Sequence, residues 1–485
     1  MAFTEFCCRS GGSNMNAGSV DGSSTEPATT ALVTYTGGDW NATTDVYTAP
    51  VGADMTEAQV GRFASLYHDG DTSPTSNQFL VARITAVNAG TRQITLSTSA
   101  RSLLGTEVAT GTANRTLKIG GSWAGPSGAS GFPFTFIGSS LTDSNTNRPR
   151  VNFKNDQTYS ITAAITAVGA GPIKYQGYGS TFGDGGRCIV DGGTSGASYT
   201  LLTVANAAGV VYQDFIFQNN GASGSSSGVI CTNISSRTTF VRCVANNLRG
   251  RGFLANSNVR AVFIECEAYS CNQSGTAGVG AFECVSGSWA SFIRCISHDN
   301  TGHGFRVTMP SHLDHCIADS NSLIGFEVLS ESVMLHCDAY NNGSHGAYIG
   351  DSGSSGSFAI QSCNFVKNGG YGLTLVSGMT VMALVSHCGF GAGTNANTSG
   401  QTNVTTGTDL VEIEGTVTYA NDVTPWVDPA NGDFRITLSA AKGAGRGTFT
   451  QTASSYSGTV GYPDIGAAQH QDSGGGTTVI VVEDD

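Results

Sequence analysis

Short runs of hydrophobic residues, separated by polar and glycine-rich stretches, recur in one arrangement between residues 238 and 395. Each copy has a cysteine with an apolar residue three positions before it. An asparagine lies about five positions after the cysteine in most copies, and a glycine with an apolar residue follows at nine and ten. The cysteines Cys243, Cys266, Cys295, Cys316, Cys337, Cys363 and Cys388 are separated by 23, 29, 21, 21, 26 and 25 residues. A repeat of this length predicts a solenoid.

The apolar runs are short, rich in β-branched and aromatic residues, and bounded by Gly, Asn and Ser, as in strands. Each repeat is therefore predicted to be one coil of a parallel β-helix, with equivalent residues stacked about 4.8 Å apart. We expect the cysteine row to fill the core and the asparagine row to form bonds between stacked amides. We also expect the repeat glycines to supply positive φ at a corner. Stacked Cβ atoms project in parallel, which disfavours disulfides and predicts free thiols.

The chain resembles the right-handed parallel β-helix proteins of the pectin-lyase-like superfamily, and among them the tailspikes and other virion proteins of phages. The resemblance covers roughly residues 117–469 and rests on the repeat and on segments such as Leu117–Gly121 and Cys188–Gly193. It implies an all-β, right-handed solenoid. It does not imply one chemistry, because that superfamily includes lyases, hydrolases, adhesins and tailspikes.

Four regions follow from these patterns. Residues 1–116 lack the repeat and are predicted to form a small β-rich attachment or capping domain, with a hairpin over residues 82–97 and a short helix over 56–66. Residues 117–440 are predicted to form the β-helix. Residues 441–472 are a C-terminal closing segment. Residues 473–485 are a glycine-rich tether followed by a terminal strand, which could close the last coil or pair with a neighbouring subunit.

The composition narrows the choice of partners. The net charge is −13, with only 23 Lys and Arg among 485 residues, so no broad cationic surface is available for nucleic acid. The sequence contains no run of eighteen apolar residues, so membrane insertion is not predicted. The first residues lack the basic and apolar regions of a secretory signal, while thirteen cysteines without disulfide spacing suit a reducing cytosol. Synthesis in the host cytoplasm followed by release within a virion reconciles these features, with an extracellular location as the alternative.

Two sets of polar residues are candidates for a functional site. The residue before each cysteine should face solvent by strand alternation, giving Arg242, Arg294, His315 and His336 as candidate glycan contacts, with Trp289, Tyr340 and Tyr348 as stacking platforms. An ordinary solvated face explains this row more simply. A glycosidase needs two carboxylates about 5 to 9 Å apart, and Asp299 and Asp319 follow successive repeat cysteines, with Asp338 and Glu327 behind them.

No cofactor or metal ion is predicted. The segment Gly443–Thr448 lacks the lysine of a phosphate loop. Cys266 and Cys271 have no second pair of ligands at zinc spacing, and His298 and His303 fall on a turn. A resemblance to pectate lyases would imply a cluster of aspartates that binds calcium and a basic residue that removes a proton. None of the five lysines lies beside an obvious aspartate cluster, so this chemistry is not predicted.

The sequence favours a largely non-catalytic phage virion protein, such as a tailspike, tail fibre or capsid-decorating protein, that attaches to a host or surface glycan. Its partners would be carbohydrate and other virion proteins. The resemblance implies a homo-oligomer, commonly a trimer. The alternatives are a polysaccharide-degrading enzyme, whether depolymerase, lyase or glycoside hydrolase, and a bacterial surface adhesin. Whether the chain is an enzyme is left open.

Overall fold

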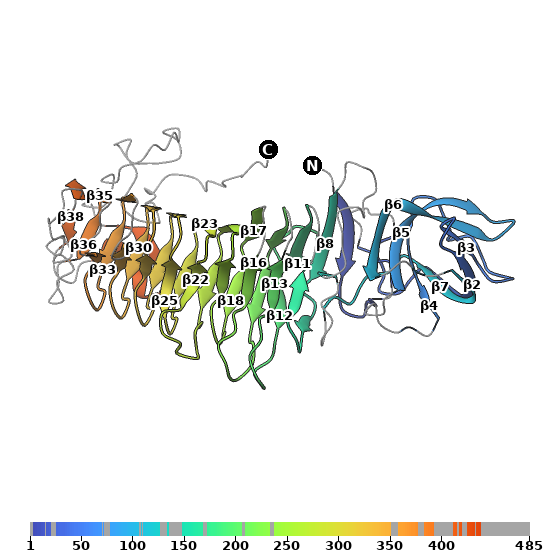
Figure 1. Ribbon diagram of the computed structural model, residues 1–485, viewed down its shortest axis with the longest axis horizontal. Helices are drawn as coiled ribbons and strands as arrows, with labels where there is room; N and C mark the ends of the chain where they lie inside the picture. The colour runs from blue at the N-terminus through green and yellow to red at the C-terminus, as the bar shows by residue number, and fades with distance from the viewer. Residues whose placement is uncertain are drawn as a thin grey trace. The chain divides into compact units, whose positions relative to one another are not determined.

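The computed structural model is all-β, with parallel sheets that form a β-helix and a closed antiparallel barrel of six strands (Figure 1), which confirms the predicted fold class. The chain divides into two compact units, residues 1–249 with 256–261, and residues 250–255 with 262–485. The structure describes residues 3–437 apart from 15, 21–25, 70, 72–77, 106–107, 109, 127–132, 135–147, 168–171, 206–208, 233–236, 351–356, 377–382, 392–410, 415–416, 420–423 and 432. No helix in this described part is long and apolar enough to cross a membrane.

The barrel of the first unit has a buried core that includes Trp40, Tyr47 and Leu80. Its strands are β2 (Val33–Asn41), β3 (Val46–Thr48), β4 (Phe63–His68), β5 (Gln78–Asn88), β6 (Gln93–Gly105) and β7 (Gly111–Ile119). β5 and β6 form the predicted hairpin, with Asn88 opposite Gln93. The predicted helix over 56–66 is wrong, because Phe63–His68 is a strand paired with β5 and β7. Five consecutive residues of β4 are buried, which a barrel strand covered on both sides allows.

The first unit also contains parallel strands in three sheets. Sheet A holds β1 (Phe3–Cys8), β8 (Arg148–Lys154), β11 (Lys174–Tyr178), β14 (Val211–Gln213) and β17 (Arg237–Val241). Sheet B holds β9 (Thr158–Ser160), β12 (Cys188–Asp191), β15 (Phe215–Gln218) and β18 (Val244–Asn246), and sheet C holds β10 (Ile165–Ala167), β13 (Leu202–Ala205) and β16 (Val229–Thr232). β1 pairs in parallel with β8, so the chain forms a strand of the parallel sheets before it forms the barrel. Residues 1–116, which were predicted to form a separate domain, therefore also contribute a strand to sheet A.

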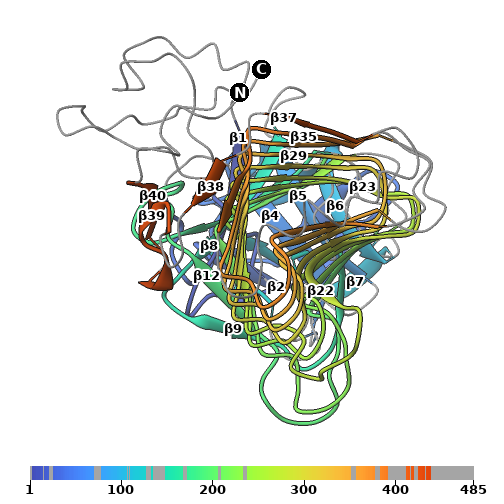
Figure 2. The same cartoon turned by 90° about the vertical axis from the view of Figure 1, so that its left-hand side faces the viewer.

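The second unit repeats the three sheets, and Figure 2 shows its coils overlaid along the stacking direction. Sheet A contains β20 (Arg260–Ile264), β23 (Trp289–Ile293), β26 (Ser311–Asp314), β29 (Ser332–Leu335), β32 (Phe358–Gln361), β35 (Ala383–Ser386) and β37 (Val411–Glu414). Sheet B contains β21 (Glu267–Tyr269), β24 (Ile296–His298), β27 (Ile317–Asp319), β30 (Asp338–Tyr340), β33 (Asn364–Val366), β36 (Gly389–Gly391) and β38 (Val417–Tyr419). Sheet C contains β19 (Phe253–Asn256), β22 (Gly280–Cys284), β25 (His303–Val307), β28 (Phe326–Val328), β31 (Ala347–Ile349) and β34 (Leu373–Leu375).

Aromatic and thiol side chains form the core of these coils. The rings of Phe282, Phe305 and Phe326 stack in sequence, with centroids 4.9 and 5.0 Å apart. Every cysteine of the predicted row is buried, as expected, and all thirteen cysteines are buried with free thiols.

The residues before the row cysteines form the corner from sheet A to sheet B. They have left-handed backbone conformations, with φ between 50° and 54° at Arg242, Glu265, Arg294, His315, His336, Ser362 and His387. The expectation that this row faces solvent by strand alternation is wrong as stated, because the strand ends before the corner. His336 and Ser362 are buried, and the other members are only partly exposed.

The asparagine row forms the predicted ladder at the next corner. Asn300 Nδ2 donates to Asn321 Oδ1 at 2.8 Å, Asn321 Nδ2 to Asn342 Oδ1 at 2.9 Å, and Asn342 Nδ2 to Asn368 Oδ1 at 2.9 Å. The role predicted for the repeat glycines is wrong. A Cβ at Gly325 would lie 2.6 Å from the carbonyl oxygen of Gly346, so glycine is required by the close approach of the next coil, and left-handed φ at neighbouring corners falls on residues such as Ser320 and Asn341.

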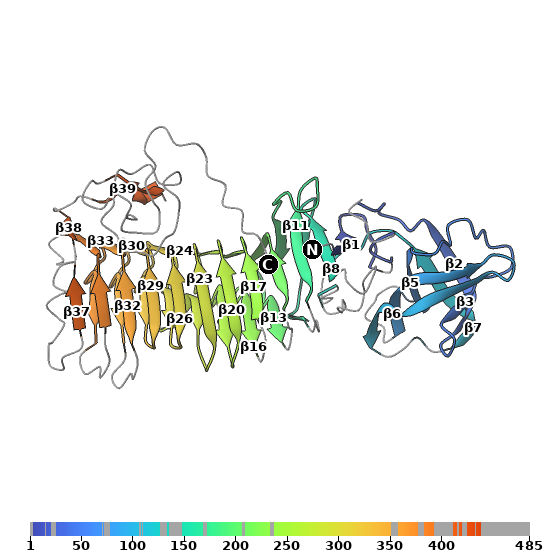
Figure 3. The ribbon, with the colours of Figure 1, turned by 90° about the horizontal axis from the view of Figure 1, so that it is seen from above.

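A short C-terminal hairpin packs on the outside of sheet B. It consists of β39 (Trp426–Asp428), a 3₁₀ turn (Pro429–Asn431) and β40 (Asp433–Ile436). Trp426, Phe434 and Ile436 are buried against Tyr340 and Val366, and Figure 3 shows β39 beside the sheet B strands. Residues 426–436 fall within the range predicted as β-helix, but they pair as an antiparallel hairpin. The predicted closing segment, 441–472, and the tail, 473–485, lie outside the described residues.

Candidate functional site

A pocket of about 380 Å³ lies between the outer face of sheet B and the C-terminal hairpin. Sheet B lines it through the outward-facing residues of β21, β24 and β27 and the corner that follows β24, while the 3₁₀ turn and β40 form the opposite wall. The lining residues are Glu267, Ile296, His298, Asp299, Ile317, Asp319, Ala430, Asn431 and Phe434. The structure therefore brings together Asp299 and Asp319, the two acids that the sequence singled out.

His298 joins two of the acids in this pocket. Its Nε2 atom lies 3.0 Å from Glu267 Oε1, and its Nδ1 atom lies 2.8 Å from Asp299 Oδ2. The imidazole stacks on the ring of Tyr269 at 5.0 Å, with the planes 11° apart. Burial lowers the pKa of His298, but the bonds and charges of Glu267 and Asp299 outweigh burial and leave the pKa raised. The arrangement favours an imidazolium that holds both carboxylates in place.

Asp319 has a different environment from Asp299. Burial, with a smaller contribution from the charge of Asp299, raises the pKa of Asp319 to about 6, against the bond from Ser320 and the charge of His298. Ser320 Oγ donates to Asp319 Oδ1 at 2.9 Å, and Asn341 Nδ2 in turn donates to Ser320 Oγ at 3.0 Å. The Asp319 carboxyl is thus fixed in orientation and carries a proton up to mildly acidic pH.

Asp299 is the exposed member of the acid pair, with 65% of its side chain accessible to solvent. It occupies a left-handed corner position with φ of 53°, and its backbone N–H donates to the carbonyl oxygen of Asp319 at 3.2 Å. Two carboxyl groups on neighbouring coils therefore face one pocket in contrasting environments. Such contrast suits the two carboxyl groups to different roles in one site.

Sequence reasoning missed Glu267 and the hairpin residues of this site, and it placed His298 on a turn, although this residue ends β24. A signal for His298 was present, because it lies three positions after Cys295, as Asp319 lies three positions after Cys316. Equal offsets place the two side chains in register on the same face. No comparable signal marks Asn431 and Phe434, since the hairpin carries no repeat and reaches sheet B through tertiary packing alone.

The candidate glycan-binding arginines are engaged in ion pairs. In the first unit, Arg242 donates Nε to Asp214 Oδ1 at 2.7 Å and Nη2 to Oδ2 at 2.8 Å. In the second unit, Arg294 donates Nε and Nη2 to Glu265 Oε1 at 3.0 and 2.8 Å. Each guanidinium is directed at the acid in the preceding coil, which is a structural role. The stacked coils explain this, because corner residues contact their equivalents along the column.

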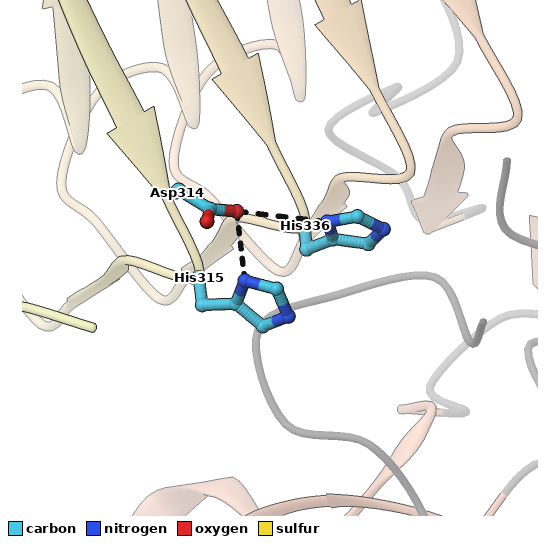
Figure 4. A group of neighbouring side chains, drawn as sticks. All are labelled: Asp314, His315 and His336. Carbon is cyan, nitrogen blue, oxygen red and sulfur yellow. Dashed lines mark hydrogen bonds and ion pairs between the residues drawn. The ribbon is translucent and has the colours of Figure 1, made fainter. Parts of the chain in front are cut away.

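The candidate histidines lie together. His315 Nδ1 is 2.7 Å from Asp314 Oδ1, and His336 Nδ1 is 3.7 Å from the same oxygen (Figure 4). The two imidazole rings stack with centroids 4.6 Å apart. Burial raises the pKa of Asp314, but the two histidines outweigh it and leave the pKa lowered. These residues lie at the corner before sheet B and do not line the pocket.

The three candidate aromatic platforms are in different environments. Trp289 is 57% exposed at the start of β23, as a stacking platform requires. Tyr340 is only 8% exposed because the rings of Trp426 and Phe434 pack edge-on against it, with centroids 5.6 and 6.2 Å away. The prediction that Tyr340 is an open platform is therefore wrong. Tyr348 is half-buried on β31, with its ring 6.1 Å from that of His345.

The remaining acids considered from the sequence lie elsewhere. Asp338 is buried and accepts a hydrogen bond from Asn364 Nδ2 at 2.9 Å. On sheet C, Glu327 accepts from Arg306 Nε at 2.7 Å, and Arg306 Nη1 donates to buried Glu283 at 2.9 Å. A second arginine, Arg251, also pairs with Glu283. In this network each carboxylate is paired with an arginine, and neither acid lines the pocket.

Comparison with known proteins supports the fold. The family model described as a right handed beta helix region matches residues 227–390, so the solenoid is right-handed. Three solved structures are similar to the chain. The A-module of mannuronan C-5 epimerase AlgE4 from Azotobacter vinelandii has 14% identity and a TM-score of 0.37, with 56% of this chain and 78% of that chain covered.

The pectate lyase Pel9A has 15% identity and a TM-score of 0.41, with 67% of this chain and 88% of that chain covered. The catalytic domain of a GH87 α-1,3-glucanase has 13% identity and a TM-score of 0.26, with 75% and 86% covered. No curated protein matches by sequence. None of these TM-scores reaches 0.5, so the fold rests on the strand pairing and the family match, and the function must be argued from the site.

Proposed function

We propose that the pocket between sheet B and the hairpin hydrolyses a glycosidic bond of a polysaccharide. The observation that carries this proposal is the pair of carboxyl groups on neighbouring coils, Asp319 with its pKa raised to about 6 and Asp299 exposed beside it. Glycosidases of most families use two carboxylic acids in this way, one as proton donor and one as nucleophile or base.

The proposed reaction uses the two acids in sequence. Asp319 donates its proton to the glycosidic oxygen as the bond to the anomeric carbon breaks. Asp299, held by His298, attacks that carbon from the other side. Retaining enzymes place the two carboxyl groups roughly 5 Å apart and inverting enzymes place them further apart, and here the two acids come from adjacent coils and line one pocket. A water molecule, deprotonated by Asp319, then releases the sugar and restores both groups.

The walls of the pocket suit a sugar. Phe434, Ile296 and Ile317 offer apolar surface, against which the C–H face of a pyranose can pack, while Asn431 and Glu267 offer hydrogen-bonding groups to hydroxyls. A cleft that combines apolar walls with a few oriented polar groups is typical of small-molecule and carbohydrate sites. The substrate class is therefore a glycan.

Hydrolysis fits the pocket better than elimination. An eliminating lyase removes a proton next to a carboxylate and needs cations to stabilise the charge that develops. Among the described lining residues the only cationic side chain is His298, which already bonds two acids. The function proposed here is therefore the polysaccharide-degrading enzyme that the sequence left as an alternative. It is not the non-catalytic attachment protein that the sequence favoured. Location on a virion stays a prediction, which mass spectrometry of purified particles would test.

The chemistry of the products tests the proposal. The full-length protein is incubated with neutral and acidic polysaccharides, and both new reducing ends and the ultraviolet absorbance of unsaturated sugars are measured. Hydrolysis predicts reducing ends without unsaturated products. Asp319→Asn should bind the cleaved polysaccharide with little change while losing turnover. Unsaturated products, or polysaccharide binding with no cleavage by the unmodified protein, would contradict hydrolysis and favour a lyase or an adhesive role respectively.

A further inference from the structure

Three side chains from two neighbouring coils converge at the corner between sheets A and B, outside the pocket. Asp314 ends β26, His315 follows it at the corner, and His336 occupies the equivalent corner one coil later. One ligand atom from each of these residues lies within 4.8 Å of the other two. Figure 4 shows the two imidazoles directed at the same oxygen of Asp314.

The backbone holds this group rigidly. The N–H of His315 donates to the carbonyl oxygen of Leu335 at 2.9 Å, and that of His336 donates to Gln361 at 3.0 Å. Each histidine is followed by a cysteine that is buried in the core, Cys316 and Cys337. Because both corners are tied to the next coil, the backbone that carries the two histidines is placed before any ligand arrives, which lowers the cost of binding.

The spacing of the ligand atoms suits a metal ion. Bonds of about 2.0 to 2.2 Å in a tetrahedral site place neighbouring ligand atoms roughly 3.3 Å apart. The observed separations from Asp314 Oδ1 are 2.7 Å to His315 Nδ1 and 3.7 Å to His336 Nδ1, which bracket that value. Small rotations of the two rings would therefore seat an ion among the three atoms. The Asp314 and His315 side chains are 22% and 14% exposed, which leaves an approach from solvent.

We propose that Asp314, His315 and His336 form a binding site for one divalent transition-metal ion of the Zn²⁺ class. Two imidazole nitrogens and one carboxylate oxygen are a ligand set suited to Zn²⁺ and its first-row neighbours, whereas Ca²⁺ and Mg²⁺ prefer oxygen ligands alone. The ion would link two successive coils at their corner. This inference does not depend on the proposed hydrolysis.

The site is tested by titrating the chelator-treated full-length protein with Zn²⁺ and measuring the heat of binding by calorimetry. The unmodified protein and the variant His312→Asn, which alters another histidine of β26, are expected to bind one Zn²⁺ per chain. Asp314→Asn and His315→Gln are expected to weaken binding by at least roughly tenfold, with circular dichroism showing that the fold is kept. His298→Asn, which removes the imidazole of the pocket, should bind Zn²⁺ like the unmodified protein.

Cobalt substitution separates this site from the buried thiols. Co²⁺ held by nitrogen and oxygen ligands gives visible bands without the intense thiolate-to-cobalt charge-transfer band. We expect that pattern, and we expect it to be lost in His315→Gln. A charge-transfer band, the absence of Zn²⁺ binding by the unmodified protein, or equal Zn²⁺ affinity in Asp314→Asn and His315→Gln would each overturn the proposal.

Discussion

His298 on β24 and Asp319 on β27 are direct register partners in parallel sheet B. Their side chains face the same pocket from successive coils. On one coil this position holds an imidazole that contacts Glu267 and Asp299. On the next coil the same position holds a carboxyl group whose pKa is about 6. The repeat supplies the spacing, and the differing residue types at the same position supply the chemistry.

The first prediction concerns the pH dependence of glycan cleavage. Asp319 must be protonated to act as the acid, and its pKa is about 6, so the rate should fall as the pH rises through about 6. The measurement is kcat/KM as a function of pH on a cleaved polysaccharide. A rate that increases between about pH 6 and 7 would assign the proton transfer to another group.

The second prediction concerns the pH dependence of stability. The pKa of Asp319 is raised in the folded protein from 3.8 to about 6, so folding favours its protonated form. Its contribution is therefore present below about pH 4 and is lost as the pH rises through about 6. His298, whose pKa is also raised, acts in the same direction. Thermal unfolding across this range should show Tm falling with pH.

The matched variant for this second prediction is Asp319→Asn, which carries no titrating group. Its Tm should depend less on pH than that of the unmodified protein between about pH 4 and 6. Equal slopes in the two proteins would mean that the Asp319 carboxyl is ionised throughout, which contradicts the environment described for it.

The repeat made much of the second unit predictable. The cysteine and asparagine positions follow from periodicity, because a parallel stack requires the same small thiol and the same amide at every coil. The corner before each cysteine was misjudged, since alternation applies within a strand and His336 lies one residue beyond β29. The identity of a left-handed corner residue is invisible to a hydrophobic pattern when Arg, His and Ser all occupy it.

The pocket was only half predictable. Asp299 and Asp319 are marked by their offsets from Cys295 and Cys316, but their environments depend on the hairpin that covers sheet B. Phe434 and Trp426 reach sheet B through packing on Tyr340. Contacts between a repeat and a non-repeating segment more than 80 residues later (426 against 340) follow no period, so neither the pocket nor the burial of Tyr340 could be derived from the sequence.

The third prediction concerns the amide ladder. Asn321 donates to Asn342 and to the carbonyl oxygen of Ser297, and accepts from Asn300. Asn321→Ala leaves buried polar groups unsatisfied and should lower the free energy of unfolding by about 2 to 4 kcal/mol. Urea denaturation measures this. The exposed Asn341→Gly, which keeps a residue suited to positive φ, should cost under about 1 kcal/mol; equal losses would argue against the ladder.

The fourth prediction tests the role of the repeat glycines. A Cβ at Gly325 would meet the Gly346 carbonyl oxygen at 2.6 Å, so Gly325→Ala should push two coils apart and lower stability by about 1 to 3 kcal/mol. Gly90→Ala, where the nearest atom lies 3.5 Å away, serves as the control and should be nearly neutral. A neutral Gly325→Ala would mean that the coils are less closely stacked than described.

The fifth prediction concerns the thiols. All thirteen cysteines are buried and free, and burial raises the pKa of the Cys231 and Cys271 thiols, which suppresses the reactive thiolate. The native protein should react slowly with a maleimide, and the protein unfolded without reductant should gain thirteen labels by intact mass. A mass corresponding to losses of two labels at a time would reveal disulfides.

If Asp319 and Asp299 together cleave a glycan, removing either carboxyl group must slow the release of reducing ends. We expect Asp319→Asn and Asp299→Asn each to slow cleavage by roughly 10² to 10⁴-fold. Glu331→Gln, an exposed carboxylate outside the pocket, should leave the rate unchanged. Unmodified rates in both aspartate variants, with the fold confirmed by circular dichroism, would contradict the claim.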